Sequence, residues 1–404
     1  MSSYLLNDFL FCVDEKEIQT KYLHYTQPLY QVNLSLKEYL SKIKKEIDKH
    51  PDKWEQYKKI TNKYEFINTP CILEKLKINH CVCNYKPISR SYFKMIEILH
   101  AFSFQFPDTL RSFHLAEGPG GFIEALAKYR QNESDQYTGM TLMQDHKDVP
   151  RWNKIQSFMK KHPCIQLEYG PKKDGNLYYR HNLDYVIQNH RSKYFFITAD
   201  GGFDYSVDFN KQEEASINLI FCEVLYALIM QKPKGSFVLK VFDIFHKTTL
   251  EVLFLLCYFY EQVYIYKPHT SREANSERYI VCKSFCVKQN YNAIIEKLIS
   301  GFKDLSKQNL NGVFRFELNS YFLCKIQEIN AIFGQQQVEN ILSTLNYIKE
   351  AQSIHRDKID KIKVTNVERC IKWCREHQQP IHEELVQSLN CWRHNDDELL
   401  SPFT

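Results

Sequence analysis

Two apolar segments of this sequence carry charged residues that could do chemistry. Asp200 directly follows the apolar run 195–199, and Lys240 stands inside the apolar run 236–242. In a doubly wound parallel sheet, ligands bind outside the carboxyl ends of the strands, so both side chains are expected at one edge. An ammonium group in an apolar strand is costly unless it is paired or functional. Lys240 therefore predicts either a general base with a lowered pKa or a structural ion pair with Asp200 or Glu277.

A glycine-rich turn follows the apolar run 112–115 and precedes a helical stretch. Its glycines allow unusual backbone angles and close approach of a ligand to the main chain. The third glycine of the dinucleotide-binding pattern G-x-G-x-x-G is replaced by Ile123, and Glu117 places an acid beside the turn. An acidic turn suits a cationic ligand such as S-adenosylmethionine better than a pyrophosphate, which argues against a nicotinamide-dependent dehydrogenase. A purely structural turn is the alternative.

Short apolar runs alternate with helical stretches between about residues 89 and 285. Strands are expected at 112–115, 137–142, 165–169, 194–199, 236–242, 263–267 and 278–285. Helices are expected at 91–102, 121–130, 212–231 and 247–260. This alternation predicts an α/β fold with a mostly parallel sheet covered by helices on both faces. Glu277 precedes the last strand, and an antiparallel course of that strand would bring Glu277 to the edge that carries Asp200.

The two ends of the chain show helical spacing of apolar residues instead. Before residue 88 the clearest helix is expected at 35–47, and after residue 287 helices are expected at 291–302, 324–332, 337–351 and 367–377. We therefore expect a helical region at 1–84, an α/β domain at 85–288 and a second helical region at 289–404.

Composition limits the class of protein. Hydrophobic residues are 44% and charged residues 25% of the 404, which is typical of a folded chain. Apolar runs are too short for a membrane span, and the N-terminus lacks the pattern of a secretory signal. Thirteen cysteines without such a signal favour reduced thiols and an intracellular location, with nucleus and cytoplasm both open. A net charge of +5 is compatible with a polyanionic partner or with ordinary solubility.

Four segments, in this order, resemble the motifs of the FtsJ-type ribose 2'-O-methyltransferases. They also resemble, more narrowly, the cap-specific mRNA (nucleoside-2'-O-)-methyltransferases of eukaryotes and large DNA viruses. The segments are 117–122, 199–203, 240–243 and 267–279, and the resemblance covers about residues 85–285. It implies a Rossmann-like sheet that is mostly parallel with an antiparallel last strand. It also implies S-adenosylmethionine as cofactor and the capped 5' end of mRNA as partner, with a cytoplasmic factory as the location if the source is viral.

The resemblance also implies roles for individual residues. The family's catalytic tetrad corresponds to Lys94, Asp200, Lys240 and Glu277. Lys240 would act as the base or orient the 2'-hydroxyl group, with its pKa lowered by Lys94 and by burial. Cofactor contacts correspond to Ser89, Ala116, Glu117, Gly118, Pro119, Gly120, Gly121, Phe122, Asn176, Leu177 and Asp200. RNA or cap contacts correspond to Arg90, Asn210, Gln212, Arg272 and Asn275. Taken singly, Lys94 and Glu277 are more typical of solvated surface charges.

Several assignments have alternatives. Asp174 could replace Asn176 as the acceptor for the adenine amino group, and the strand 137–142 lacks an acidic residue to bind the ribose. The cysteines at 81, 83, 370 and 374 lack a second pair at zinc-ligand spacing, so no metal is predicted, and burial on one helix face explains Cys370 and Cys374. The lysine-rich stretch 42–49 is predicted as a solvated helix face, with an RNA guide as the alternative.

Three functions follow from these residues. The first is methylation of the first transcribed nucleotide of capped mRNA, which produces a cap-1 end, with other capping or transcription proteins as further candidate partners. The second is the same chemistry on ribosomal or transfer RNA. The third is a non-catalytic RNA-binding accessory subunit, against which the intact tetrad argues.

Overall fold

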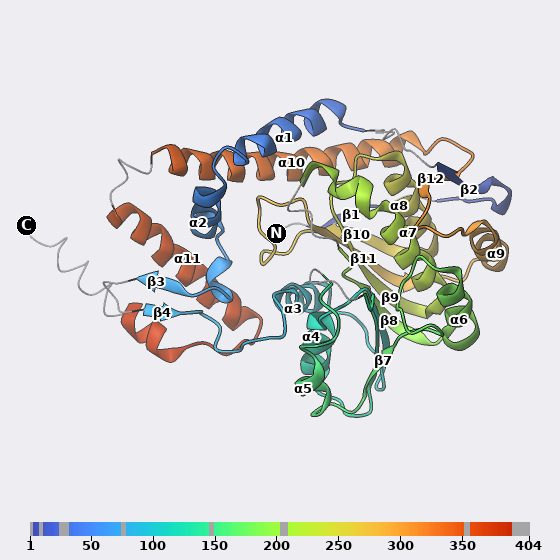
Figure 1. The fold of residues 1–404 in the computed structure, drawn as a ribbon, viewed down its shortest axis with the longest axis horizontal. Helices are drawn as coiled ribbons and strands as arrows, with labels where there is room; N and C mark the ends of the chain where they lie inside the picture. The colour runs from blue at the N-terminus through green and yellow to red at the C-terminus, as the bar shows by residue number, and fades with distance from the viewer. Residues whose placement is uncertain are drawn as a thin grey trace, which may run out of the picture.

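The computed structural model describes residues 3–7, 11–23, 32–73, 78–144, 149–202, 209–350 and 356–389. Its centre is an eight-stranded sheet in the order β1-β10-β11-β9-β8-β5-β6-β7 (Figure 1). The strands are β1 (Tyr4–Leu5), β5 (Arg111–Leu115), β6 (Gln136–Met140), β7 (Ile165–Glu168), β8 (Tyr194–Ala199), β9 (Gln231–Val241), β10 (Tyr260–Tyr266) and β11 (Arg278–Phe285). All seven strands expected in the central region are therefore present.

The direction of the strands explains why charged residues meet at one edge. Strands β5 to β9 are parallel, whereas β11 runs antiparallel between β9 and β10, and β1 runs antiparallel on the far side of β10. The predicted antiparallel last strand is confirmed. Tyr279 pairs with Lys240 and Arg278 pairs with Val241. Glu277, one residue earlier, therefore lies where β9 ends.

Helices cover both faces of the sheet, as the alternating pattern predicts. One face packs against α6 (Arg180–His190), α7 (Gln212–Met230), α8 (Lys247–Phe259) and α9 (Tyr291–Gly301). The other packs against α3 (Ser91–Phe102), α4 (Gly121–Arg130), the short α5 (Gln156–Met159) and, beyond them, α11 (Arg356–Glu376). Strand β9 shows the alternation, because Phe237 and Leu239 belong to the first core and Val238 to the second.

The two ends of the chain pack together. Helix α1 (Leu34–Ile47) runs beside the long helix α10 (Ser320–Lys349), and α2 (Pro51–Thr61) packs against α10 from below in this view (Figure 1). Strand β2 (Ile18–Leu23) pairs with β12 (Asn309–Phe314), and the turn η2 (Glu65–Ile67) contacts α11. The three-part division at residues 84 and 288 stays a prediction, since residues from both ends contribute to the same layers.

Several expected elements differ from those observed. The region 1–84 is not only helical, since it contains β1, β2 and the hairpin β3 (Cys71–Leu73) and β4 (Ile78–His80). The helices expected at 324–332 and 337–351 are one helix, α10, because the buried residues Phe333 and Gly334 continue its packed face across the gap. Helices α5 and α6 and strand β12 were not predicted. Residues 203 and 351 of the expected segments lie outside the described ranges.

Within the described ranges, no helix combines the length and the apolar character needed to cross a lipid bilayer.

The contact between α2 and α10 is predicted to hold the terminal layer on the body. Ile341 of α10 is fully buried against Trp54, Tyr57 and Ile60, whereas its neighbour Leu342 is 36% exposed. We expect Ile341→Ala to lower the free energy of unfolding by about 2–5 kcal/mol and Leu342→Ala by no more than about 0.5 kcal/mol. Urea unfolding followed by circular dichroism measures both changes, and equal losses would contradict the packing described here.

Candidate active site

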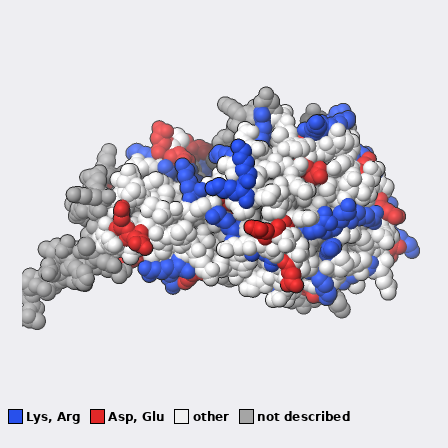
Figure 2. Space-filling model, turned by 90° about the horizontal axis from the view of Figure 1, so that it is seen from below, with Lys and Arg blue, Asp and Glu red and all other residues white. Residues whose placement is uncertain are grey.

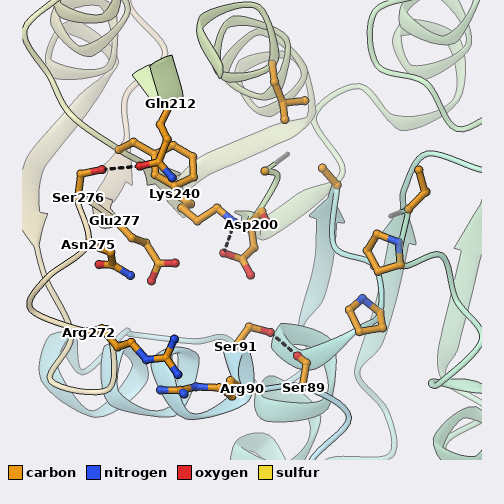
Figure 3. Close-up of a pocket in the computed structure, with 18 of the residues that line it drawn as sticks. Ser89, Arg90, Ser91, Asp200, Gln212, Lys240, Arg272, Asn275, Ser276 and Glu277 are labelled. Atoms are coloured by element: carbon orange, nitrogen blue, oxygen red, sulfur yellow. Dashed lines mark hydrogen bonds and ion pairs between the residues drawn. The ribbon is translucent and has the colours of Figure 1, made fainter. Parts of the chain in front are cut away.

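A cavity of about 1080 Å³ opens at the carboxyl edge of the sheet (Figure 3). Its walls come from the segments that follow β5, β6, β8 and β9, from the loop that precedes β11, and from the start of α3. Residues of α1, α2 and α10 close its far end. The cavity therefore joins the edge predicted to carry chemistry to the layer formed by the chain ends.

Three of the four predicted tetrad residues, Asp200, Lys240 and Glu277, line this cavity, and Lys94 joins them from outside the lining through its pair with Glu277. Lys240 Nζ lies 3.3 Å from Asp200 Oδ1 and donates a hydrogen bond of 2.7 Å to the Asp200 main-chain oxygen. Lys94 Nζ lies 2.7 and 2.8 Å from the two carboxylate oxygens of Glu277. All four side chains are only 11–16% exposed. Lys94 and Glu277 are therefore not the solvated surface charges that each alone would suggest.

The charge state of Lys240 differs from the prediction. Burial lowers the pKa of Lys240, but the carboxylates of Asp200, Glu277 and Glu223 together outweigh burial, so its pKa is raised above the usual value. The prediction that the pKa of Lys240 is lowered is therefore wrong for the protein without a bound ligand. Glu277 neutralises the charge of Lys94, and three acidic residues act on Lys240. At neutral pH, Lys240 is an ammonium group and a hydrogen-bond donor.

Two buried residues that were not predicted hold Asp200 in place. The Tyr279 hydroxyl group donates to Asp200 Oδ1 at 3.0 Å. Glu223 of α7 accepts the main-chain N–H of Gly201, and burial raises the pKa of Glu223 to about 8. A Cβ atom at Gly201 would lie 2.3 Å from Glu223 Oε1, so only glycine fits there. The packing of α7 under the end of β8 thus shapes the floor of the site.

Only part of the glycine turn faces the cavity. Ala116, Gly118 and Pro119 line it, and the side chain of Thr141 accepts the Gly118 N–H at 3.2 Å. Ser89 also lines the cavity and lies beside Gly121 of the turn, with its Oγ atom 2.6 Å from Ser91 Oγ (Figure 3).

The other predicted turn residues lie behind the cavity lining. Glu117 is 3% exposed and accepts the Phe122 N–H at 2.6 Å, so its carboxyl group caps α4. Burial and the nearby Asp200 raise the pKa of Glu117 well above its usual value. The expectation that Glu117 presents an exposed anion is therefore wrong, and Asp200 supplies that charge. A Cβ at Gly120 would meet Ile155 at 2.4 Å, and one at Gly121 would meet Ser89 and Ser91 at 2.2 Å.

The segment after β7 contains Asn176 and Asp174, the two residues predicted as acceptors for the adenine amino group. Asn176 and Leu177 line the cavity. Asp174 lies outside the lining, where its carboxylate accepts hydrogen bonds from the Asn176 N–H, Asn182 and His181. Of the two predicted acceptors, Asn176 is therefore the one that lines the cavity, although its Oδ1 atom already accepts the Tyr178 N–H at 3.0 Å. Thr141 and Gln144 after β6 line the cavity, and neither is acidic.

Four of the five predicted RNA or cap contacts line the cavity, namely Arg90, Gln212, Arg272 and Asn275. Asn210 lies outside the lining, in the turn η4 (Phe209–Lys211). Gln212 Oε1 accepts the Ser276 hydroxyl group at 2.9 Å, and the guanidinium groups of Arg90 and Arg272 lie along one wall (Figure 3).

The loop 268–277, which carries three of the predicted residues, is held by buried charges. Lys267 Nζ donates to Asn275 O at 2.7 Å, to Asn275 Oδ1 at 2.9 Å and to Glu277 O at 2.9 Å. Glu97 of α3 accepts the main-chain N–H groups of His269 and Thr270 at 2.6 and 3.1 Å. Burial lowers the pKa of Lys267 to about 7.

Sequence reasoning missed the residues that the chain ends contribute to the cavity. They are Lys44, Ile47, Trp54, Lys58, Asn62, Gln337 and Asn340. The spacing of four residues that places Trp54, Lys58 and Asn62 on one face of α2 is the signal that could have found three of them. Lys44 contradicts the predicted solvated face, because it is 8% exposed and lies 3.1 Å from Asp243 Oδ2.

The cysteine clusters have a packing explanation. Cys370 and Cys374 are fully buried on one face of α11, which confirms the prediction for this helix, and Cys83 is buried in the same core. The described residues contain no group of three histidine, cysteine or acidic side chains placed to hold a metal ion.

Surface charge alone does not mark a binding face. Figure 2 shows lysine and arginine side chains gathered near the middle of one face, with acidic side chains close by. Positively charged side chains that could bind a ligand lie instead in the lining of the cavity. They are Lys240, Arg90 and Arg272.

Comparison with known proteins identifies the central part of the chain. The family described as FtsJ-like methyltransferase matches residues 87–285. Residues 87–285 are an FtsJ-like methyltransferase domain. The match covers β5 to β11, the glycine turn and all four tetrad positions.

Three relatives illustrate the similarity. Cap-specific mRNA (nucleoside-2'-O-)-methyltransferase 1 of Drosophila melanogaster is 38% identical over 44% of this chain and 22% of its own length. Cap-specific mRNA (nucleoside-2'-O-)-methyltransferase 2 of Danio rerio is 27% identical over 84% of this chain and 46% of its own. Probable methyltransferase EP424R of African swine fever virus is 26% identical over 70% of this chain and 67% of its own. The chain thus spans less than half the length of these two animal relatives.

S-adenosylmethionine is the methyl donor of such a domain, and the cavity fits it. The small residues Ala116 and Gly118 leave the main chain accessible, and Asp200 offers a carboxylate to a cationic group. Asn176 and Leu177 place an amide and an apolar side chain at the other end of this wall, which suits an adenine ring. These residues would hold the donor between the turn and Asp200.

Glu277 gives the site a predicted dependence on pH. Burial alone would raise its pKa, but Lys94, Lys240 and Lys267 lower it from 4.5 to about 2. A carboxylate with a depressed folded-state pKa stabilises the fold above its unfolded pKa, and this contribution is lost as the pH falls from about 4.5 toward 2. We expect Glu277→Gln to cost about 3 kcal/mol near neutral pH and progressively less at about pH 3.

Urea unfolding of both proteins across this pH range measures the effect. Glu55→Gln is the control, because the Glu55 side chain is 63% exposed and pairs at the surface with Lys58. A cost for Glu277→Gln that stays constant with pH would contradict the assigned charge state.

Proposed function

We propose that this chain is an S-adenosylmethionine-dependent methyltransferase that modifies the ribose 2'-hydroxyl group of the first transcribed nucleotide of capped mRNA. The observation that carries the proposal is that Asp200, Lys240 and Glu277 line one cavity of an FtsJ-like domain, with Lys94 paired to Glu277 beside it. The printed names of the animal relatives support the cap as the substrate.

The charges of the tetrad suit this chemistry. S-adenosylmethionine supplies a methyl group on a sulfonium when it is bound. Lys240 orients the attacking hydroxyl oxygen by hydrogen bonding, and orientation of this kind supplies about 7–11 kcal/mol in well-aligned systems. Asp200 holds the Lys240 proton most directly, at 3.3 Å. When Asp200 also neutralises a cationic ligand, its effect on the pKa of Lys240 weakens, so Lys240 can release its own proton to solvent. The neutral amine then accepts the hydroxyl proton as the ribose oxygen takes the methyl group.

Lys94 and Glu277 act on Lys240 from the other side. Glu277 is paired with Lys94 through both oxygens and raises the pKa of Lys240 by its charge. Loss of that pair would leave Lys240 beside an uncompensated charge in a buried site. We therefore assign Lys94 and Glu277 to setting the position and the proton affinity of Lys240, and Lys240 to contact with the substrate.

The shape of the cavity supports an RNA end as the second ligand. Beyond the tetrad the cavity continues past Arg90 and Arg272, which suit phosphate groups, to Trp54 of α2. Trp54 is 8% exposed and packs in the core between α2 and α10, so it contributes an apolar wall there. The buried amide oxygens of Asn62 and Gln337 have no hydrogen-bond partner among the described residues. They suit the N–H donors of a guanine edge.

The proposed substrate implies action inside the cell, in the nucleus or the cytoplasm. Other capping or transcription proteins are further partners in this proposal.

Lys240→Ala is expected to reduce the rate of methyl transfer by at least about 10²–10⁴-fold, because it removes both the orienting donor and the base. S-adenosylmethionine binding, measured by calorimetry, is expected to remain within about threefold, since Ala116, Asn176 and Leu177 stay in place. Retained turnover in Lys240→Ala would refute the assignment.

A short capped RNA and its uncapped copy test the substrate. We expect methylation of the capped RNA to exceed that of the uncapped copy by at least about tenfold, since a lost buried hydrogen-bonded contact costs about 1–3 kcal/mol. Mass mapping of the product is expected to place the methyl group on the first transcribed nucleotide. Equal methylation of both RNAs would indicate ribosomal or transfer RNA as the substrate.

A further inference from the structure

One buried carboxylate of the N-terminal region lies at the centre of the arginine wall. Glu65 of η2 stands outside the domain at residues 87–285 and is 1% exposed. Its Oε1 atom accepts from Arg90 at 2.8 Å, from Arg272 at 2.8 Å and from the Thr69 hydroxyl group at 2.9 Å. Its Oε2 atom accepts from Arg272 Nε at 2.9 Å and from Asn62 Nδ2 at 2.6 Å. Five hydrogen bonds therefore converge on one carboxylate.

The charge balance of this cluster leaves it cationic. Burial would raise the pKa of Glu65, but Arg272 and Arg90 lower it far below its usual value, so the carboxylate stays ionised. Two guanidinium groups and one carboxylate carry a net charge of +1. The carboxylate also offsets the repulsion between the two guanidinium groups, which lie along the same wall (Figure 3).

The cluster is open on the side of the cavity. The side chains of Arg90 and Arg272 are 33% and 31% exposed, and both line the cavity, whereas Glu65 is enclosed behind them. Arg272 uses Nε and one terminal nitrogen on Glu65, and Arg90 uses one terminal nitrogen. The remaining N–H groups of both arginines are free of Glu65 and match the oxygen atoms of a phosphate group.

Both arginines are attached to the elements that carry the tetrad. Arg90 directly precedes α3, which bears Lys94 one turn later, and Arg272 belongs to the loop that ends at Glu277. A phosphate held by the pair would therefore have a fixed position relative to the reacting hydroxyl group.

We propose that Glu65 is a positioning residue that holds Arg90 and Arg272 as a two-arginine clamp for a phosphate group at the 5' end of the substrate. This inference rests on the proposed function and extends it to a residue of the N-terminal region. Glu65 touches no substrate in this arrangement and acts through the geometry of the two guanidinium groups.

The variant Glu65→Gln separates positioning from charge. It keeps the size of the side chain but makes the cluster more positive by one unit. A role limited to charge balance predicts tighter RNA binding, whereas a positioning role predicts weaker binding. We expect the KM for capped RNA to rise at least about tenfold, with kcat at saturating RNA and the KM for S-adenosylmethionine within about twofold of wild type.

Two further variants complete the test. Glu296→Gln changes the charge by the same amount at an exposed acid of α9 outside the cavity lining, and it is expected to leave the KM for RNA within about twofold. Arg272→Lys keeps the charge but loses the two-pronged contact with Glu65, and it is expected to raise the KM for RNA as Glu65→Gln does. Arg272→Lys also serves as the test if circular dichroism shows that Glu65→Gln does not fold.

The outcomes distinguish the clamp from the proposed function. If wild type methylates capped RNA and a folded Glu65→Gln variant shows an unchanged or lower KM for it, the clamp is refuted and the function stands. If wild type methylates capped and uncapped RNA equally, the proposed cap specificity fails. A raised KM in Glu65→Gln on both RNAs would then still support the clamp.

Discussion

The structure of the site depends on keeping two positively and two negatively charged side chains together at one buried edge of the sheet. Two ammonium groups and two carboxylates removed from water are tolerable only when each is paired and hydrogen-bonded, because the desolvation cost of a lone ion is several kcal/mol. The antiparallel course of β11 beside β9 meets this requirement, since it brings Glu277 within range of Lys94 while Asp200 stays next to Lys240. A parallel last strand would begin at the opposite edge.

This arrangement needs a rigid loop between β10 and β11, and buried polar groups provide it. Lys267 binds three oxygen atoms near the end of the loop, and Glu97 binds two main-chain N–H groups near its start. Glu97 and Lys94 lie one turn apart on α3, so the helix that supplies one amine of the tetrad also anchors the loop that supplies its carboxylate. The position of Glu277 is therefore determined from both ends.

The central sheet and the placement of Asp200 and Lys240 at its edge could be predicted from sequence because their signals are local, whereas Lys94 and Glu277 joined the predicted tetrad only through the family resemblance. Apolar runs of strand length end at Asp200 and surround Lys240, and the glycine turn stands between a strand and a helix. Charge states could not be predicted in this way. The pKa of Lys240 depends on Glu223, which lies on α7 between the segments of Asp200 and Lys240 and reaches the site only through the packing of that helix. The role of Glu117 as a helix cap could not be predicted either, because it depends on burial of its carboxyl group by neighbouring residues.

The contribution of the chain ends was hidden for the same reason. Glu65 and Trp54 show no unusual spacing to the motifs of the central domain, and only the packing of α2 on α10 brings that layer to the cavity. The tetrad and the glycine turn lie within residues 87–285, whereas the walls farthest from the tetrad come from outside this range. In the function proposed above, chemistry and substrate choice are divided along the chain. Methyl transfer is assigned to the sheet edge, and discrimination between RNA ends is assigned to a layer that the sheet alone does not determine.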